Sequence, residues 1–291
     1  MEIDRKELKR RARERMALTD PKFWVVTLTY LAMTTGISWI ISLIPVSGSG
    51  TATMFFQLLL NLYTAVVQFG LCLWALWTYR QLDPGVNSLM QGFSVAGRVL
   101  LMQLGIYVRV LGWYFLISLA LAVPMVSLLV YADYAVGMIA LLLFAAALLT
   151  ALIVLQLRYA LAPYLLADRP DDGSTIPILR SVSLMRGWKM ELFKLEFSFI
   201  GWEAVNFILS ASVTVFFLAR AGLLSAAAFS DADWRELCLN VVYSTPTVIL
   251  STLVTVPINL RLIPYRAVAR AGFYDARLMA AAQDNPTMPP L

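Results

Sequence analysis

The chain has 291 residues, of which 60% are hydrophobic and 14% are charged. Soluble globular proteins have about 45–50% apolar and about 25% charged residues, so this composition excludes an ordinary soluble domain and indicates an integral membrane protein. The absence of histidine removes the commonest general base and the commonest metal ligand. The two cysteines, Cys72 and Cys238, form no disulfide framework and no CxxC metal motif.

A basic segment comes first, and residues 1–22 are predicted to form a cytoplasmic amphipathic helix with an apolar edge at Ile3, Leu8, Ala12 and Met16. Six apolar runs follow, each long enough to cross a bilayer as a helix, which takes about 20 residues. The first is too long for the hydrophobic core of a signal peptide. The prediction is an all-α polytopic protein with a membrane domain over 23–263, a cytoplasmic tail over 264–291, and spans at about 23–45, 52–79, 104–131, 135–158, 197–219 and 244–263.

Short links, such as the one at Asp133, predict that the spans form three antiparallel hairpins. Residues 87–93 (NSLMQGF) match residues 182–188 (VSLMRGW), and each copy precedes a span. We therefore expect three repeated units, each a cytoplasmic amphipathic helix followed by a hairpin. Internal repeats are common in transporters, but gene duplication leaves them in any membrane protein, so both origins stay open. Pro163 and Pro264 are expected to mark helix exits.

The orientation follows from the Lys and Arg residues, which concentrate in cytoplasmic loops. All 23 of them except Arg220 and Arg235 fall on one side of the predicted spans, so both termini are predicted to be cytoplasmic. These charges lie beside spans, which indicates anionic lipid headgroups as partners rather than nucleic acid. The basic N-terminal helix could itself lie on the lipid surface; the interpretation we favour is that it only fixes the topology.

The second copy of the repeat resembles the signature of a bacterial integral-membrane family catalogued as domain of unknown function 975. The residues that carry the resemblance are Asp168, Pro170, Ser181, Leu184 to Lys189, Leu192-Phe193 and Phe197 to Trp202, together with Pro264-Tyr265 and Phe273-Tyr274 near the end. The resemblance covers nearly the whole chain and implies a polytopic protein of the bacterial plasma membrane. It implies no activity. Arg186 stands where the family usually has Lys, which keeps the charge.

Polar residues at helical spacing form stripes on three spans. They are Gln57, Asn61, Thr64 and Gln68 on the second span, Glu203, Asn206 and Ser210 on the fifth, and Thr247, Ser251, Thr255 and Asn259 on the sixth. One hypothesis is a hydrated cavity for a polar substrate or a lipid headgroup. The other, which we favour, is interhelical hydrogen bonding that holds the bundle together.

Glu203 is an ionisable residue inside a span. A charged side chain at the bilayer centre costs about 2.5–3.5 kcal/mol on insertion scales, so it needs a partner or a function. Arg109, Arg158 and Arg261 are expected at similar depth, and we predict an ionic cluster of Glu203 with one or more of them. The cluster could mark a substrate or proton pathway, or it could fix helix packing.

The sequence contains no Walker, GxGxxG, GxSxG or HExxH motif, and it names no catalytic, cofactor-binding or metal-binding residue. We therefore expect a non-enzymatic component without a cofactor. Its first predicted role is that of an accessory subunit that binds a membrane protein partner in a transport or envelope system. The alternative is a small carrier or lipid-handling protein with a polar cavity around Glu203.

Overall fold

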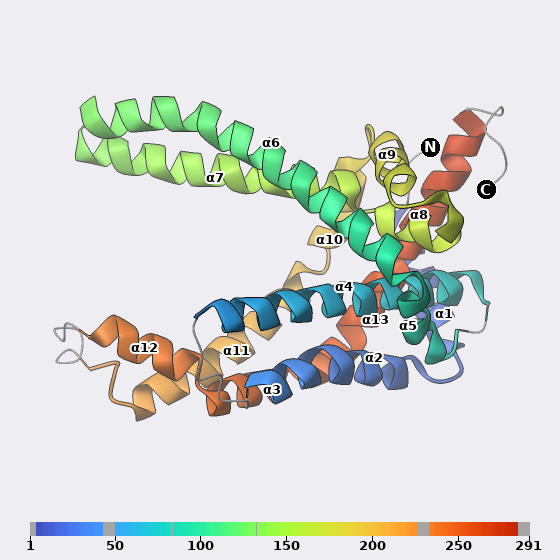
Figure 1. Ribbon diagram of the computed structural model, residues 1–291, viewed down its shortest axis with the longest axis horizontal. Coiled ribbons are helices and arrows are strands. Elements are labelled where there is room, and N and C mark those ends of the chain that lie inside the picture. The colour runs from blue at the N-terminus through green and yellow to red at the C-terminus, as the bar shows by residue number, and fades with distance from the viewer. Residues whose placement is uncertain (1–3, 43–49, 83, 132, 226–232, 285–291) are drawn as a thin grey trace. The chain divides into compact units, whose positions relative to one another are not determined.

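The computed structural model describes residues 4–42, 50–82, 84–131, 133–225 and 233–284. These residues contain helices and no strand, which confirms the predicted all-α fold (Figure 1). In chain order the elements are α1 (Arg5–Ala17), α2 (Phe23–Leu31), the π-helical turn η1 (Ala32–Gly36), α3 (Ile37–Ser42), α4 (Gly50–Arg80), α5 (Asn87–Gln91), the 3₁₀ turn η2 (Gly92–Val95), α6 (Ala96–Tyr131), α7 (Tyr134–Tyr159), α8 (Ala162–Asp168), the 3₁₀ turn η3 (Pro170–Asp172), α9 (Thr175–Leu184), α10 (Lys189–Phe197), α11 (Ile200–Arg220), α12 (Trp234–Val242) and α13 (Thr245–Asp284).

Five helical segments among the described residues are long and apolar enough to cross a membrane. They contain α4, α6, α7, α11 and α13, and they correspond to the second through sixth predicted spans. The first predicted span begins in α2 and continues through η1 and α3 to Ser42, and its last residues lie outside the described part of the chain. The chain is thus a multi-pass membrane protein, while the count of six spans stays a prediction.

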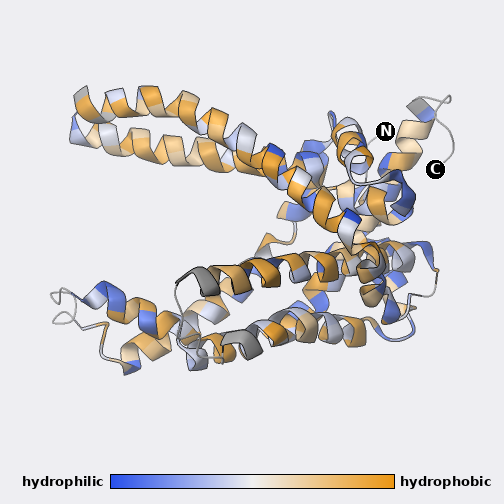
Figure 2. Ribbon diagram, in the orientation of Figure 1, coloured by the Kyte–Doolittle hydropathy of each residue, from blue (hydrophilic) through white to orange (hydrophobic). Residues whose placement is uncertain are grey.

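The contacts divide the chain into two compact units. Unit 1 contains residues 91–194 and, at the C-terminal end, residues from 273 onward; unit 2 contains residues 4–90 and 195–272. Within unit 1, α6 and α7 pack along each other, and α9 packs on α6, α7 and α8. The surfaces of α6 and α7 are apolar along most of their length, as lipid-facing helices require (Figure 2).

Unit 2 is built around α4. Its core includes Val67, Trp74 and Leu76 of that helix, all at most 1% exposed. Val67 and Trp74 are seven residues apart and share one face, whereas Leu76 lies on the opposite face, so this part of α4 is buried on two sides. Gly70 on the same helix lets the backbone at Leu89 approach closely, because a Cβ at Gly70 would lie 2.4 Å from the Leu89 carbonyl oxygen.

The last helix differs from the prediction. The expected exit at Pro264 is wrong, because α13 contains Pro257 and Pro264 in its interior and continues to Asp284. A proline in a helix costs about 3 kcal/mol or more through its missing N–H and its clash with the preceding turn. Burial of the helix beyond Pro264 offsets this cost, since Val268, Ala269, Ala271, Phe273 and Tyr274 are at most 1% exposed.

Candidate functional site

The carboxylate of Glu203, in the first turn of α11, pairs with an arginine that the sequence did not indicate. Its Oε1 lies 2.9 Å from Nη1 of Arg266 on α13. Arg261 lies in the same unit, and its membership of the cluster stays a prediction. Arg266 lies five residues further along α13, beyond Pro264 in the part of the helix that was expected to be tail.

The other two arginines of the predicted cluster belong to unit 1. There Arg109 donates from Nη1 to the carbonyl of Gly105, one turn earlier on α6, at 2.9 Å. The guanidinium of Arg158 lies 5.9 Å from the ring centroid of Tyr159 on α7. Both side chains therefore have local partners on their own helices.

Glu196 is the centre of a second and more buried set of ion pairs, which sequence reasoning missed. Its side chain is 14% exposed, and its Oε2 accepts from Nε of Arg266 at 2.5 Å while its Oε1 accepts from Nε of Arg270. Burial raises the pKa of Glu196, but Arg270 and Arg266 outweigh burial, and the net pKa is lowered from its ordinary value. Glu196 is therefore ionised at neutral pH, and its charge is shared by two arginines.

The helix break before α11 makes this arrangement possible. Glu196 lies near the end of α10, and α11 begins at Ile200, so the two carboxylates flank the break. Arg266 and Arg270 are four residues apart on α13, which places both guanidinium groups on one helical face. That four-residue spacing beyond the sixth span is the signal by which the sequence could have indicated the cluster.

The polar stripes have different environments on the three helices. On α11 and α13, Nδ2 of Asn206 donates to Oδ1 of Asn259 at 2.9 Å, which joins the two spans directly. Thr255 donates to the Ser251 and Thr252 carbonyls of its own helix, and Ser210 is half-buried. On α4, the three predicted stripe residues Gln57, Asn61 and Gln68 are all exposed. The Asn206–Asn259 contact is the geometry expected of interhelical hydrogen bonding.

The Asn206–Asn259 hydrogen bond is expected to contribute about 0.6 kcal/mol, the average for interhelical hydrogen bonds in membranes. Asn259→Leu should lower the free energy of unfolding more than Asn206→Leu does. The buried Oδ1 of Asn206 already has no partner in the described residues, so Asn259→Leu would leave both polar atoms of the Asn206 amide without a partner there. A double-mutant cycle measured by SDS-induced unfolding in mixed micelles tests both statements. Thr255→Val, which removes only hydrogen bonds within α13, is the control and should show no coupling to Asn206.

Four residues of the signature, Asp168, Leu184, Trp188 and Tyr274, take part in contacts of the C-terminal part of α13 within unit 1. The hydroxyl of Tyr274 donates to Oδ2 of Asp168 at 2.7 Å, and its ring stacks on Tyr164 with centroids 5.8 Å apart. Arg277 donates from Nε and Nη2 to the Leu184 carbonyl at the end of α9, at 3.2 and 3.0 Å. The guanidinium of Arg277 also lies 4.2 Å from the ring centroid of Trp188. The signature thus has a structural use: it anchors the extension of the last helix.

Arg277→Lys should lower the free energy of unfolding by about 1–2 kcal/mol. The ammonium cannot reproduce both hydrogen bonds to the Leu184 carbonyl or the planar stacking on Trp188, and hydrogen bonds to charged groups contribute about 1.5–3 kcal/mol. The same SDS unfolding measurement applies. Arg220→Lys, at an exposed residue, is the matched control and should stay within about 0.5 kcal/mol of the wild type. Equal effects of the two substitutions would contradict the anchoring role.

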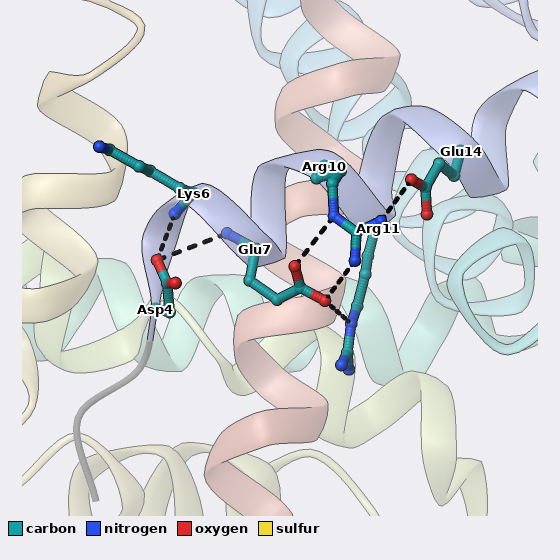
Figure 3. A network of polar contacts seen from close by, with 6 residues as sticks. All are labelled: Asp4, Lys6, Glu7, Arg10, Arg11 and Glu14. Atoms are coloured by element: carbon teal, nitrogen blue, oxygen red, sulfur yellow. Dashed lines mark hydrogen bonds and ion pairs between the residues drawn. The ribbon is translucent and has the colours of Figure 1, made fainter.

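The N-terminal helix α1 docks against the protein through the apolar edge that the sequence indicated. Leu8, Ala12 and Met16 are at most 6% exposed, and α1 packs on α4. Asp4 caps the helix by accepting from the backbone N–H groups of Lys6 and Glu7 (Figure 3). The apolar edge therefore faces protein, and the basic residues of α1 are left for the outer surface.

Comparison with known proteins gives one match. A family model described as "Protein of unknown function (DUF975)" matches residues 1–280, a region that includes Asp168, Trp188 and Tyr274. This confirms the resemblance indicated by the sequence. No curated protein and no solved structure matches the chain.

Proposed function

Since the chain belongs to the family described as DUF975, which carries no assigned activity, we propose a role from the chain's own geometry. The protein is a non-enzymatic component of a bacterial inner membrane that binds a membrane protein partner, as an accessory subunit of a transport or envelope system. It uses the exposed side of the short helix α9 in unit 1 as the docking face. Its N- and C-termini are cytoplasmic, which the one-sided distribution of Lys and Arg supports.

The observation that carries this proposal is the packing of the chain outside its apolar spans. The α13 extension is buried beyond Pro264, anchored by Tyr274 and Arg277, and tied by Arg266 and Arg270 to Glu196. A chain that needed only to cross the bilayer would not require these contacts. Ordered surfaces that a rigid scaffold holds in place are the usual location of binding sites.

Helix α9 supplies the most specific candidate for the docking face. It buries Pro177, Ile178 and Leu184 within the protein and exposes Ile176 and Leu179, which are 42% and 59% exposed. Two exposed aliphatic side chains three residues apart lie on one face of a helix, as in helix-mediated recognition. Both belong to unit 1, beside the anchored end of α13.

The test is purification of the tagged, full-length protein from native membranes into nanodiscs, followed by mass spectrometry for proteins and small molecules. A stoichiometric protein partner that is lost in Ile176→Ser/Leu179→Ser supports the proposal. Ser183→Ala, an exposed substitution on the same helix, is the control and should retain the partner. A protein that is free of partners but carries one enriched metabolite, lost in Glu203→Gln, would contradict the proposal and support a carrier.

A further inference from the structure

Three cationic side chains lie one turn apart on a single side of α1. Arg5, Lys9 and Arg13 follow one another at intervals of four residues, the spacing that aligns side chains on one helical face. Arg5 and Arg13 are exposed, and Lys9 is half-buried. Within the described part of the chain, none of the three forms an ion pair with a carboxylate.

Four other charges of the same helix, those of Glu7, Arg10, Arg11 and Glu14, are arranged differently. Glu7 pairs with Arg10 at 2.8 Å and with Arg11 at 2.7 Å, and Arg10 also pairs with Glu14 at 2.9 Å (Figure 3). The hydrogen bonds from Arg10 and Arg11 lower the pKa of Glu7 to about 2. Glu7, Arg10, Arg11 and Glu14 therefore compensate one another, whereas Arg5, Lys9 and Arg13 have no carboxylate partner among the ion pairs of the described residues.

The side chain of Lys9 contacts the start of the fifth span. Its Nζ donates to the Ser198 carbonyl at 3.3 Å and lies 4.3 Å from the ring centroid of Phe199. Burial, followed by repulsion from Arg13 and Arg5, lowers the pKa of Lys9 from its ordinary value. A bound anion would relieve this repulsion, because an opposite charge at a few ångströms favours the charged form of each cation.

Aromatic residues at the start of an apolar span lie near the three cations. Phe199 packs edge-to-face on Tyr265, with ring centroids 5.1 Å apart, and Arg13 is close enough to Tyr265 to act on it electrostatically. Directly after Phe199, α11 begins its apolar span at Ile200, whose side chain is 51% exposed. Aromatic residues at a span end, next to basic side chains, are typical of the level of lipid headgroups.

We propose that Arg5, Lys9 and Arg13 bind the phosphate headgroup of an anionic glycerophospholipid whose acyl chains lie along the exposed beginning of α11. The guanidinium and ammonium groups supply donors for the phosphate oxygens, and the apolar side chains from Ile200 onward supply the surface for the chains. A phospholipid fits better than free phosphate because only the lipid uses both parts of the site. This inference goes beyond the proposed binding of a protein partner and does not depend on it.

Native mass spectrometry of the full-length protein in detergent tests the proposal by titration with phosphatidylglycerol and with phosphatidylcholine of the same acyl chains. The wild type should bind its first phosphatidylglycerol at least tenfold more tightly than phosphatidylcholine. Arg5→Gln/Arg13→Gln should lose this preference, since each basic residue near a lipid surface contributes about 1 kcal/mol, or about fivefold. Lys9 is left unchanged because of its packing on Phe199.

The matched control is Lys6→Gln/Arg15→Gln, which removes the same charge from other positions of α1 and should keep the preference. Arg5→Lys/Arg13→Lys should keep most of it, and size-exclusion chromatography establishes that every variant is folded. The proposal is overturned if the wild type has no preference for the anionic lipid, or if both Gln variants lose it equally. Competition by millimolar inorganic phosphate at unchanged pH would assign the site to a soluble phosphate and overturn the lipid proposal.

Discussion

Glu196→Gln is expected to destabilise the protein by about 3 kcal/mol. Removal of one partner from a buried ion pair costs about 3–5 kcal/mol, because the remaining charges stay desolvated without compensation. Here Arg266 and Arg270 are each 36% exposed, so solvent screens them in part and the cost falls at the low end of that range. Equilibrium unfolding by SDS in mixed micelles measures the effect.

The neighbouring carboxylate provides the control for this experiment. Glu203 pairs with the same Arg266, but its side chain is 47% exposed, so Glu203→Gln should cost less than about 1 kcal/mol. If Glu203→Gln were the more damaging substitution, the carboxylate that stabilises α13 at Arg266 would be Glu203 rather than Glu196.

The same ion pairs predict a dependence on pH. The folded pKa of Glu196 is lowered, so the pairs are fully present above the unfolded glutamate pKa of about 4.3. Their contribution is lost as the pH falls from that value through the lowered folded pKa. The difference in stability between the wild type and Glu196→Gln should therefore be constant near neutral pH and shrink only in acid. A difference that disappeared between pH 6 and 8 would contradict this account.

Gly70→Ala is expected to destabilise the protein by about 2–3 kcal/mol. The added Cβ would lie 2.4 Å from the carbonyl oxygen and 2.8 Å from the Cα of Leu89, and both are backbone atoms that no side-chain rotation can move away. Overpacking of this kind costs about 1–3 kcal/mol, and here it would force α4 and the backbone at the start of α5 apart. The loss should appear as a lower SDS unfolding midpoint and a weaker yield of monodisperse protein.

A second glycine-to-alanine substitution separates crowding from helix propensity. At Gly97 on α6, a Cβ would meet no atom within 4 Å, so Gly97→Ala should leave the stability unchanged or raise it by up to about 1 kcal/mol. The same glycine-to-alanine change is thus expected to lower the stability at Gly70 and to leave it unchanged or raise it at Gly97. This pair of results would establish that the close approach of Leu89 to α4 is a requirement of the fold.

The residues around Glu196 and the contact between Gly70 and Leu89 both fix short helices against long ones. The proposed docking face on α9 and the proposed lipid site on α1 use the surfaces of such short helices. Loss of stability and loss of binding can be distinguished, because the binding variants change exposed residues only.

The spans could be predicted from the sequence because membrane insertion depends on local hydrophobicity. A helix that crosses lipid satisfies its backbone hydrogen bonds within itself, so about 20 apolar residues suffice to specify it. The helices α4, α7 and α11 accordingly begin and end within three residues of the predicted limits, whereas α6 ends at the predicted residue but begins eight residues earlier. The apolar edge of α1 followed from the same kind of periodicity, and Leu8, Ala12 and Met16 are buried.

The polar contacts depended on the tertiary structure. Helical spacing placed Asn206 and Asn259 on polar stripes, but only the packing of α11 against α13 joined them by a hydrogen bond. The partner of Glu203 could not be predicted from depth alone, because α13 does not end at Pro264 and presents Arg266 two residues later. Glu196 had no visible role in the sequence, since the arginines that surround it are about 70 residues away along the chain.

The sequence by itself thus determined which segments are helices in lipid and which edge of α1 is apolar, because both are set by neighbours within a few turns. The tertiary structure decided which charges pair, where α13 stops, and what the signature residues hold in place. Those outcomes depend on the rotation and register of helices that are distant in sequence. They are fixed by packing energies such as the burial of Phe273 and Tyr274, which outweigh the local preference of Pro264 to end a helix.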